Sequence, residues 1–240
     1  MQSSMIICDA RTGSNLLGFS LNKHPAVRYG DEILCESTYC IPPVMKEHAI
    51  SYGVDLFKDV TLSVEKRRLI AKPEYLDYAF KNFNLVKLLY YHIDIKNLEL
   101  IEYIKNFKGK IIHLKRKSYL DKCISWFIAQ RDDGFLYIHR PPRKKPIVID
   151  IEKLKFYLDR MIFQEQFWDM IFKGMRVKTV YYNELVNEWD TTIESCQKYL
   201  GITTMPVKKS TCQAINKPNI ELVQNKREVL EFMNDYIDYI

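Results

Sequence analysis

The residues best suited to chemistry lie between a short apolar run at 5–8 and an apolar-spaced segment that starts at Leu16. The run is typical of a buried strand and the spacing of a helix, so the polar residues between them form a strand-to-helix loop. Such a loop surrounds an anion with backbone N–H groups and with the N-terminus of the helix. Gly13 lets the backbone approach a ligand, and Arg11 can bind a phosphate or sulfate through two N–H groups. The predicted anion-binding loop comprises Arg11, Thr12, Gly13, Ser14, Asn15 and Leu16.

This loop differs from the Walker A loop of nucleotide kinases, G-x-x-x-x-G-K-[ST]. Ser14 stands where that motif has its lysine, and Asn15 stands where it has the hydroxyl that binds Mg²⁺. We therefore expect an anion that is bound without a metal, and phosphoryl transfer is poorly supported. A small kinase or nucleotide hydrolase on a related fold is the alternative, and metal-dependent turnover of ATP would distinguish it. A strand-to-helix turn with glycine and serine is also common without any ligand.

A second pair of candidate ligand-binding residues follows another short apolar run, at 110–114. Arg116 comes just after this expected strand, and Ser125 lies within the helix that Ser118 would cap. In an open parallel sheet ligands bind at the carboxyl ends of the strands, so Arg11 and Arg116 would share one rim. Two anion sites on one rim suit a nucleoside with phosphates at both ends. Taken singly, Arg116 could instead pair with a surface carboxylate, and Ser125 could bond to a helix carbonyl.

The elements that must position these residues alternate along the chain. Strands are expected at 5–8, 84–91, 110–114 and 177–182, and helices at 16–21, 65–71, 73–80, 96–107, 118–130, 151–172, 191–200 and 225–237. This alternation predicts an α/β fold with a central parallel sheet that is flanked by helices on both faces. No repeat, low-complexity tract or linker is evident, so residues 1–240 are expected to form a single domain.

Composition excludes several classes of function. Apolar residues make up 47% and charged residues 28%, which is ordinary for a soluble globular protein. The net charge of +6 suits an anionic ligand, but the basic residues form no long run and nucleic acid is not an expected partner. A solvated loop explains the densest basic cluster about as well as a phosphate site does. This cluster is Arg140, Arg143, Lys144 and Lys145.

Cysteine and histidine usage predicts no metal site. The six cysteines include no CxxC pair, and the five histidines are scattered. No signal peptide precedes the first strand, and no apolar run approaches the ~20 residues that a membrane-spanning helix needs. Free thiols without an export signal predict a cytoplasmic protein with no integral membrane segment. The sequence does not fix the oligomeric state.

Together the two clusters resemble the sulfotransferases that depend on 3′-phosphoadenosine 5′-phosphosulfate (PAPS), closest to the bacterial carbohydrate branch that sulfates trehalose-type glycolipids and nodulation factors. In that family a loop of the form Pro-Arg-[Ser/Thr]-Gly-Ser-[Thr/Asn]-Leu-Leu binds the 5′-phosphosulfate. Residues 11–17 match it, with Ala10 in place of the usual proline. The family's 3′-phosphate signature is an arginine after a strand and a serine about one helix later, which Arg116 and Ser125 match. A weaker similarity lies at 181–185.

The resemblance implies a fold related to the P-loop kinases. It also implies transfer of a sulfuryl group from PAPS to an acceptor hydroxyl, which leaves 3′,5′-ADP and requires no metal. The acceptor would be a small molecule or a glycan, with a carbohydrate or glycolipid hydroxyl as the first choice. A non-catalytic member of the fold that binds nucleotide or glycan is an alternative.

The resemblance also suggests which residue accepts the proton of the hydroxyl. In the trehalose-type branch a carboxylate shortly after the first helix does so, and Glu32 lies at that point, with Asp31 as a near alternative. The branch that sulfates aryl alcohols and steroids uses a histidine, and His92 lies near its position, at a longer spacing from Lys87. Histidine is a natural general base near neutral pH, although His92 could instead bind the acceptor or cap a strand.

Three lysines near the C-terminus fall where a family loop covers the nucleotide, although a solvated charged loop explains them as well. They are Lys208, Lys209 and Lys217.

Overall fold

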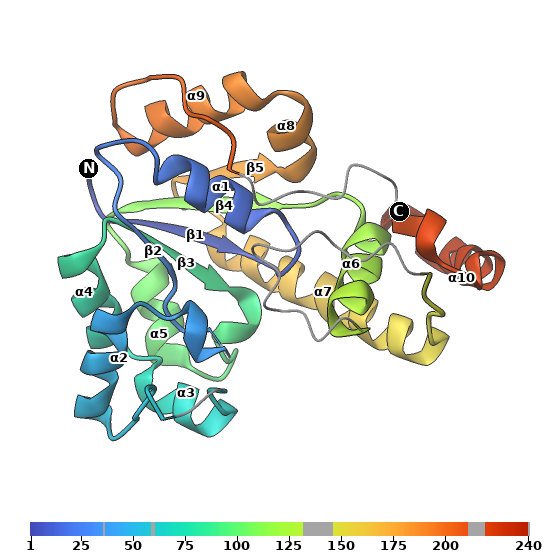
Figure 1. Cartoon of the computed structure of the whole chain (residues 1–240), viewed down its shortest axis with the longest axis horizontal. Helices are drawn as coiled ribbons and strands as arrows, with labels where there is room; N and C mark the ends of the chain where they lie inside the picture. The colour runs from blue at the N-terminus through green and yellow to red at the C-terminus, as the bar shows by residue number, and fades with distance from the viewer. Residues whose placement is uncertain (36, 59–60, 132–145, 211–218, 240) are drawn as a thin grey trace.

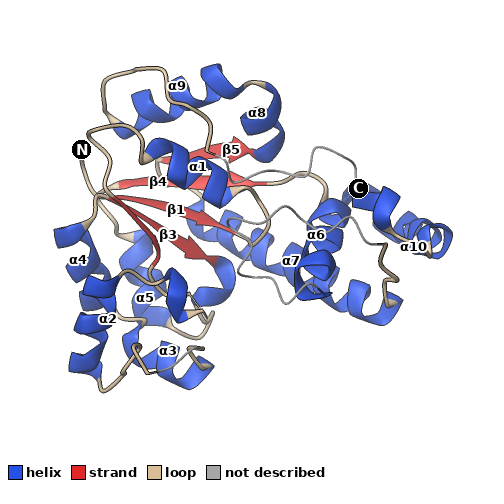
Figure 2. Cartoon of the chain, in the orientation of Figure 1, coloured by secondary structure: helices blue, strands red, loops and turns tan. Residues whose placement is uncertain are grey.

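The computed structural model describes residues 1–35, 37–58, 61–131, 146–210 and 219–239. Within this part of the chain the strands form a five-stranded sheet in the order β2-β3-β1-β4-β5, and every neighbouring pair is parallel (Figures 1 and 2). The strands are β1 (Ser4–Cys8), β2 (Tyr29–Glu32), β3 (Leu85–Leu89), β4 (Lys110–Lys115) and β5 (Val177–Tyr181). The predicted α/β fold with a central parallel sheet is thereby confirmed.

Helices cover both faces of this sheet (Figure 1). They are α1 (Ser14–Leu21), α2 (Pro43–Ala49), α3 (Val64–Ile70), α4 (Pro73–Asn82), α5 (Leu98–Lys105), α6 (Tyr119–Arg131), α7 (Ile151–Phe172), α8 (Tyr182–Asn187), α9 (Trp189–Leu200) and α10 (Lys226–Met233). The central strand β1 is buried on both sides, as a parallel strand between two helical layers must be. Its Met5 and Ile7 pack with α2, α4, α5 and the end of α7, whereas Ile6 and Cys8 pack with α1, α8 and α9.

A third apolar cluster joins α6, the first half of α7 and α10, beyond the carboxyl ends of the strands (Figure 1). Cys123 and Ile124 of α6 pack there with Leu154 and Leu158 of α7. This cluster fixes α6, the helix that follows β4, at the edge of the sheet where the predicted anion-binding residues lie. No helix among the described residues is both long and apolar enough to cross a lipid bilayer.

Four predicted helix boundaries are confirmed by the residues that stand at them. The Ser63 Oγ accepts the backbone N–H of Lys66 at 3.3 Å, and the Ser118 Oγ accepts that of Asp121 at 3.1 Å. Pro73 occupies the first turn of α4, where its missing N–H costs nothing. Gly201 ends α9 in the left-handed conformation, with φ 72°.

Three boundary predictions were wrong. Helix α9 begins at Trp189 rather than after a Thr191 cap, because α8 runs almost directly into it. Strand β3 ends at Leu89, and residues Tyr90–His92 turn in a 3₁₀-helix that carries His92 away from the strand direction. The final helix stops at Met233 and continues as a 3₁₀ segment, Asn234–Tyr239.

Strand β2 was not predicted. Its sequence is Tyr-Gly-Asp-Glu, which is too short and too polar to stand out as an apolar run. Among the residues that the structure describes it pairs with β3 alone, at an edge of the sheet where polar side chains are tolerated. Its side chains are nonetheless part of the site described next.

Candidate active site

The loop between β1 and α1 is held in an unusual backbone conformation. Arg11 and Gly13 both have positive φ, 62° and 88°. The Thr12 hydroxyl donates to the carbonyl oxygen of Asp9 at 2.8 Å, and the Asp9 carboxylate accepts the Ala10 N–H at 2.7 Å. The loop therefore turns sharply and delivers the chain into α1, whose N-terminal N–H groups favour an anion.

Gly13 is required by its neighbour as well as by its backbone. A Cβ placed at Gly13 would lie 2.6 Å from Cδ2 of Tyr182, the first residue of α8. The Tyr182 ring also lies under the guanidinium of Arg116, 4.6 Å from the ring centroid. The motif at 181–185, which the sequence offered only as a weak similarity, thus contributes a ring that packs between the two predicted anion-binding segments.

The structure brings these two segments together. The Arg11 Nε donates to the Ser125 Oγ at 2.9 Å, although the two residues are 114 positions apart. Arg116 donates from Nη1 to the Arg11 carbonyl oxygen at 3.3 Å and pairs with Asp121 at 3.2 Å. Two guanidinium groups and a hydroxyl therefore meet at the carboxyl ends of β1 and β4, which is the shared rim that the sequence predicted.

The remaining loop residues differ in what they can offer a ligand. Ser14 begins α1, and both Ser14 and Leu16 are buried. The apolar side chain of Leu16 anchors the helix, while the Leu16 N–H lies in the first turn. The Thr12 hydroxyl is committed to Asp9. Asn15 accepts a hydrogen bond from Lys87 through its Oδ1. The groups available to an anion are therefore mainly backbone N–H groups, Arg11 and Ser14.

A second group of charges adjoins the loop on β2 and β3. Lys87 is fully buried in the middle of β3, and its Nζ lies 2.7 Å from Glu32 Oε1 and 3.0 Å from Asp31 Oδ1. The sheet register places Glu32 beside Lys87. The contact between Lys87 and Asn15 ties this ion pair to the first turn of α1. The sequence signal for Lys87 was a lysine inside an otherwise apolar strand.

The ionisation states of Glu32, Lys87 and His92 follow from their burial and from the ion pair between Glu32 and Lys87. Burial acts to raise the pKa of Glu32, but Lys87 and His92 outweigh it and lower that pKa to about 2. Burial acts to lower the pKa of Lys87, but Glu32 and its neighbours hold it well above the usual value. Burial lowers the pKa of His92 to about 3. At neutral pH the site therefore holds an ionised Glu32, a charged Lys87 and a neutral imidazole.

Glu32 and His92, which the sequence presented as alternatives, lie in the same cluster. The His92 Nδ1 accepts the backbone N–H of Leu89 at 3.2 Å. Its Nε2 lies 3.8 Å from Glu32 Oε2. Cys35, three residues beyond Glu32, completes a group in which one ligand atom from each of the three residues lies within 4.8 Å of the others.

A buried charge network beneath the loop was not predicted. Lys122 of α6 lies 3.0 Å from Asp9 and 3.5 Å from Glu165 of α7, and Lys115 lies 3.1 Å from Glu165. Lys122 is fully buried, as few lysines are. A usable sequence signal was its spacing, because Lys122 lies three residues before Ser125 and therefore on the same side of α6.

The C-terminal lysines do not meet at the anion loop in the described part of the chain. Lys209 packs over the Trp189 ring at 5.3 Å, and its carbonyl accepts from Lys23 Nζ at 3.0 Å. Lys208 is exposed. Lys217 and the basic cluster at 140–145 lie outside the described residues.

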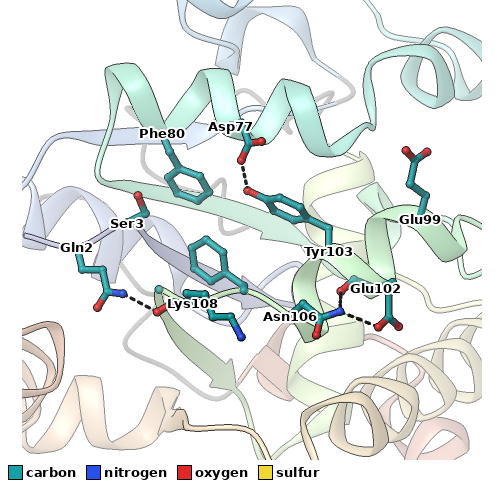
Figure 3. Close-up of a pocket in the computed structure, with 11 residues that line it drawn as sticks. Gln2, Ser3, Asp77, Phe80, Glu99, Glu102, Tyr103, Asn106 and Lys108 are labelled. Carbon is teal, nitrogen blue, oxygen red and sulfur yellow. Dashed lines mark hydrogen bonds between the residues drawn. The ribbon is translucent and has the colours of Figure 1, made fainter.

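A surface hollow of about 670 Å³ lies at the opposite edge of the sheet (Figure 3). Residues that precede β1 and β4, including Gln2 and Gly109, line it together with α4 and α5. Tyr103 crosses it and donates to Asp77 at 2.5 Å, beside Phe80. It contains none of the predicted site residues, so we do not place the active site there.

Comparison with solved structures defines the class of the fold. The structure is similar to the sulfotransferase domain from the curacin biosynthetic pathway, with a TM-score of 0.53 and 14% identity over 85% of this chain and 75% of that one. It is also similar to a sulfotransferase from Alicyclobacillus acidocaldarius, with a TM-score of 0.51 and 14% identity over 100% of this chain and 94% of that one. The chain thus has the fold of sulfotransferase domains.

These similarities do not single out the carbohydrate branch. Neither a family model nor a curated protein matches the sequence.

Proposed function

We propose that this protein is a sulfotransferase that moves a sulfuryl group from PAPS to an acceptor hydroxyl on a carbohydrate or glycolipid. One observation carries the proposal. On a sulfotransferase fold, the left-handed loop after β1 meets Arg116 and Ser125 at the carboxyl edge of the sheet, with Arg11 in contact with both. The donor set consists of guanidinium, hydroxyl and backbone N–H groups, which suits a nucleotide with separate phosphates.

The two segments divide the nucleotide between them. The N–H groups at the start of α1, together with Arg11 and Ser14, bind the 5′-phosphosulfate. Arg116 and Ser125 bind the 3′-phosphate. Asn15 and Thr12 act mainly by fixing the loop, since the side chain of each is engaged with Lys87 or Asp9.

When bound, PAPS supplies a sulfuryl group that an acceptor oxygen attacks in line. Glu32 takes the proton of the hydroxyl, because it is ionised at neutral pH. A carboxylate with so low a pKa is a weak base, so the proton moves late, once the oxygen has begun to bond to sulfur and has become acidic. The α1 N-terminus and Arg11 stabilise the charge that develops on the leaving phosphate.

The nucleotide assignment is tested by binding. Arg116→Ala and Ser125→Ala should each weaken the binding of 3′,5′-ADP much more than the binding of 5′-AMP, because only 3′,5′-ADP carries a 3′-phosphate. Isothermal titration of both nucleotides measures the ratio of their dissociation constants, which we expect to fall toward one in the variants. If both nucleotides bind equally more weakly to the variants, Arg116 and Ser125 do not bind the 3′-phosphate.

The reaction is tested by transfer of labelled sulfate from PAPS to a panel of glycans. Glu32→Gln should lower turnover by roughly 10²- to 10⁴-fold, as loss of a general base does, while 3′,5′-ADP still binds. Asp31→Asn is the matched control, since it lies beside the same lysine. A Glu32→Gln variant with full activity would exclude Glu32 as the base. Mg²⁺-dependent ATP turnover without sulfate transfer would favour a kinase, and 3′,5′-ADP binding without any transfer would favour a non-catalytic protein.

A further inference from the structure

The imidazole of His92 is held in one orientation and one tautomer. Its side chain is fully buried, and Nδ1 accepts the backbone N–H of Leu89 at 3.2 Å. A neutral imidazole has one N–H and one acceptor nitrogen. Because Nδ1 is the acceptor, the ring proton lies on Nε2, the atom that faces Glu32.

This Nε2–H has no hydrogen-bond partner within the described part of the chain. Glu32 Oε2 lies 3.8 Å away, beyond the range of a hydrogen bond. A buried donor without a partner is costly, and buried polar groups are paired in most structures. Two atoms at this separation can both bond to one oxygen atom, which reaches the buried Nε2 only when the surrounding side chains move apart.

The other ligand to consider is a metal ion, since Glu32, Cys35 and His92 lie close enough together to ligate one. Two features oppose it. The Nε2 of His92 offers a proton rather than the lone pair that a metal requires. Lys87 already supplies a positive charge 2.7 Å from Glu32. The geometry therefore favours a neutral guest that both accepts and donates hydrogen bonds.

We propose that His92 Nε2–H and Glu32 Oε2 hold the acceptor hydroxyl between them and thereby restrict the enzyme to oxygen acceptors. This inference rests on the proposed sulfotransferase function. A hydroxyl oxygen has two lone pairs, so it accepts from His92 with one and attacks sulfur with the other while its hydrogen points to Glu32. A neutral amine has a single lone pair and cannot do both, and an ammonium group has none.

The step balances without a further reactant. The acceptor oxygen forms a bond to sulfur as the bond between sulfur and the phosphate oxygen breaks, and the electron pair of that bond leaves with the phosphate. The hydroxyl proton passes to Glu32. His92 keeps its proton throughout, so it is a donor and not the base.

The first test needs no turnover. In protein labelled with ¹⁵N-histidine, long-range ¹H–¹⁵N spectra distinguish the two neutral tautomers and the charged ring, and the His92 signals are identified by their loss in His92→Gln. We expect the neutral Nε2–H form from pH 8 down to pH 5. A charged ring at pH 6, or the proton on Nδ1, would overturn the inference whether or not the protein transfers sulfate.

The second test compares matched acceptors, trehalose with 6-amino-6-deoxytrehalose and glucose with glucosamine. His92→Met removes the donor and should lower kcat/KM for the alcohols by 10- to 100-fold, with a smaller loss for the amines. His92→Gln places an amide N–H near the position of Nε2 and should recover part of the loss. Selectivity for oxygen that survives in a folded His92→Met variant would contradict the proposal.

Two controls separate this inference from the proposed function. If 3′,5′-ADP does not bind and no acceptor is sulfated, the proposed function itself fails, whatever the tautomer. If sulfate is transferred but equilibrium dialysis finds one Zn²⁺ per chain that is lost in His92→Met, Nε2 is a ligand and the donor role is wrong. Absence of such Zn²⁺ binding, with the expected tautomer, supports the hydroxyl clamp.

Discussion

Gly13 is constrained both by its backbone conformation and by its contact with a neighbouring ring. It has φ 88°, and a Cβ there would press on the Tyr182 ring at 2.6 Å. Gly53 has a similar φ of 75° but has nothing within 4 Å of the corresponding position. The two glycines therefore separate backbone strain from the steric contact.

We predict that Gly13→Ala strongly weakens 3′,5′-ADP binding, whereas Gly53→Ala does not. Each substitution forces alanine into the left-handed region and costs about 1–2 kcal/mol of stability. Only Gly13→Ala also displaces Tyr182, which packs under Arg116. Thermal unfolding and 3′,5′-ADP titration of both variants check this, and equal binding by the two would show that the contact with Tyr182 is unimportant.

At the same scale, the sequence predicted some residues and concealed others. Arg11 and Arg116 were predicted because each follows a strand, and Ser125 because it lies in the helix after the second of these strands; the structure brings the three into contact. The joint cluster of Glu32 and His92 was not predicted, because it depends on the register of β2 against β3 and on the 3₁₀ turn after β3. Pairing between distant segments leaves no local pattern.

Among the elements, α6 and α7 are tied to the loop by charge. Lys122 contacts Asp9 after β1 and Glu165 of α7 while fully buried. Removing one partner from such a network leaves uncompensated charge in the interior.

We predict that Lys122→Met lowers the free energy of unfolding by roughly 3–5 kcal/mol, the cost of breaking a buried ion pair. Asp9→Asn in the same chain should recover part of that loss, because it removes one of the two stranded carboxylates. Lys117→Met is the control: Lys117 is exposed and its Nζ lies 5.0 Å from the centroid of the Tyr181 ring, so this change should cost no more than about 1 kcal/mol. Urea unfolding of the set gives the coupling energy, and additive effects of Lys122→Met and Asp9→Asn would contradict the network.

At the level of elements, the sequence predicted the central strands and the helices better than the edge strand β2 and the start of α9. Strands β1, β3 and β4 lie in largely apolar runs, which indicate burial between two helical layers. Strand β5 was also predicted, although it is an edge strand and is partly exposed. Strand β2 is an edge strand of polar residues, so its position follows from pairing with β3 rather than from its own composition. The start of α9 was misplaced because two helices meet there without a polar linker.

For the whole molecule, two of the buried histidines, His92 and His113, contribute to a loss of stability in acid. Burial lowers the pKa of His92 to about 3 and that of His113 to about 4, from 6.5. Between these values and 6.5 the unfolded chain binds protons that the folded chain does not, so stability is lost as the pH falls.

We predict that the free energy of unfolding falls by up to roughly 3 kcal/mol per pH unit between pH 6 and pH 4, with one proton for each histidine. Glu32, whose pKa is lowered to about 2, adds to the loss below pH 4.5. His113→Gln should remove about half of the slope, because Gln does not titrate. Urea unfolding at pH 7, 6 and 5 measures it, and an unchanged slope in that variant would show that His113 is protonated in the folded state.

The contact between Arg11 and Ser125 has a consequence for how the protein is made. The first half of the proposed anion site leaves the ribosome long before the second, since 114 residues separate Arg11 from Ser125. Contacts so distant in sequence form late and slowly. A nascent chain therefore lacks part of the proposed nucleotide site until α6 (Tyr119–Arg131) has been synthesised and β4 has joined β1. If the proposed site binds a nucleotide, that nucleotide can stabilise the chain only after both steps, not an earlier intermediate.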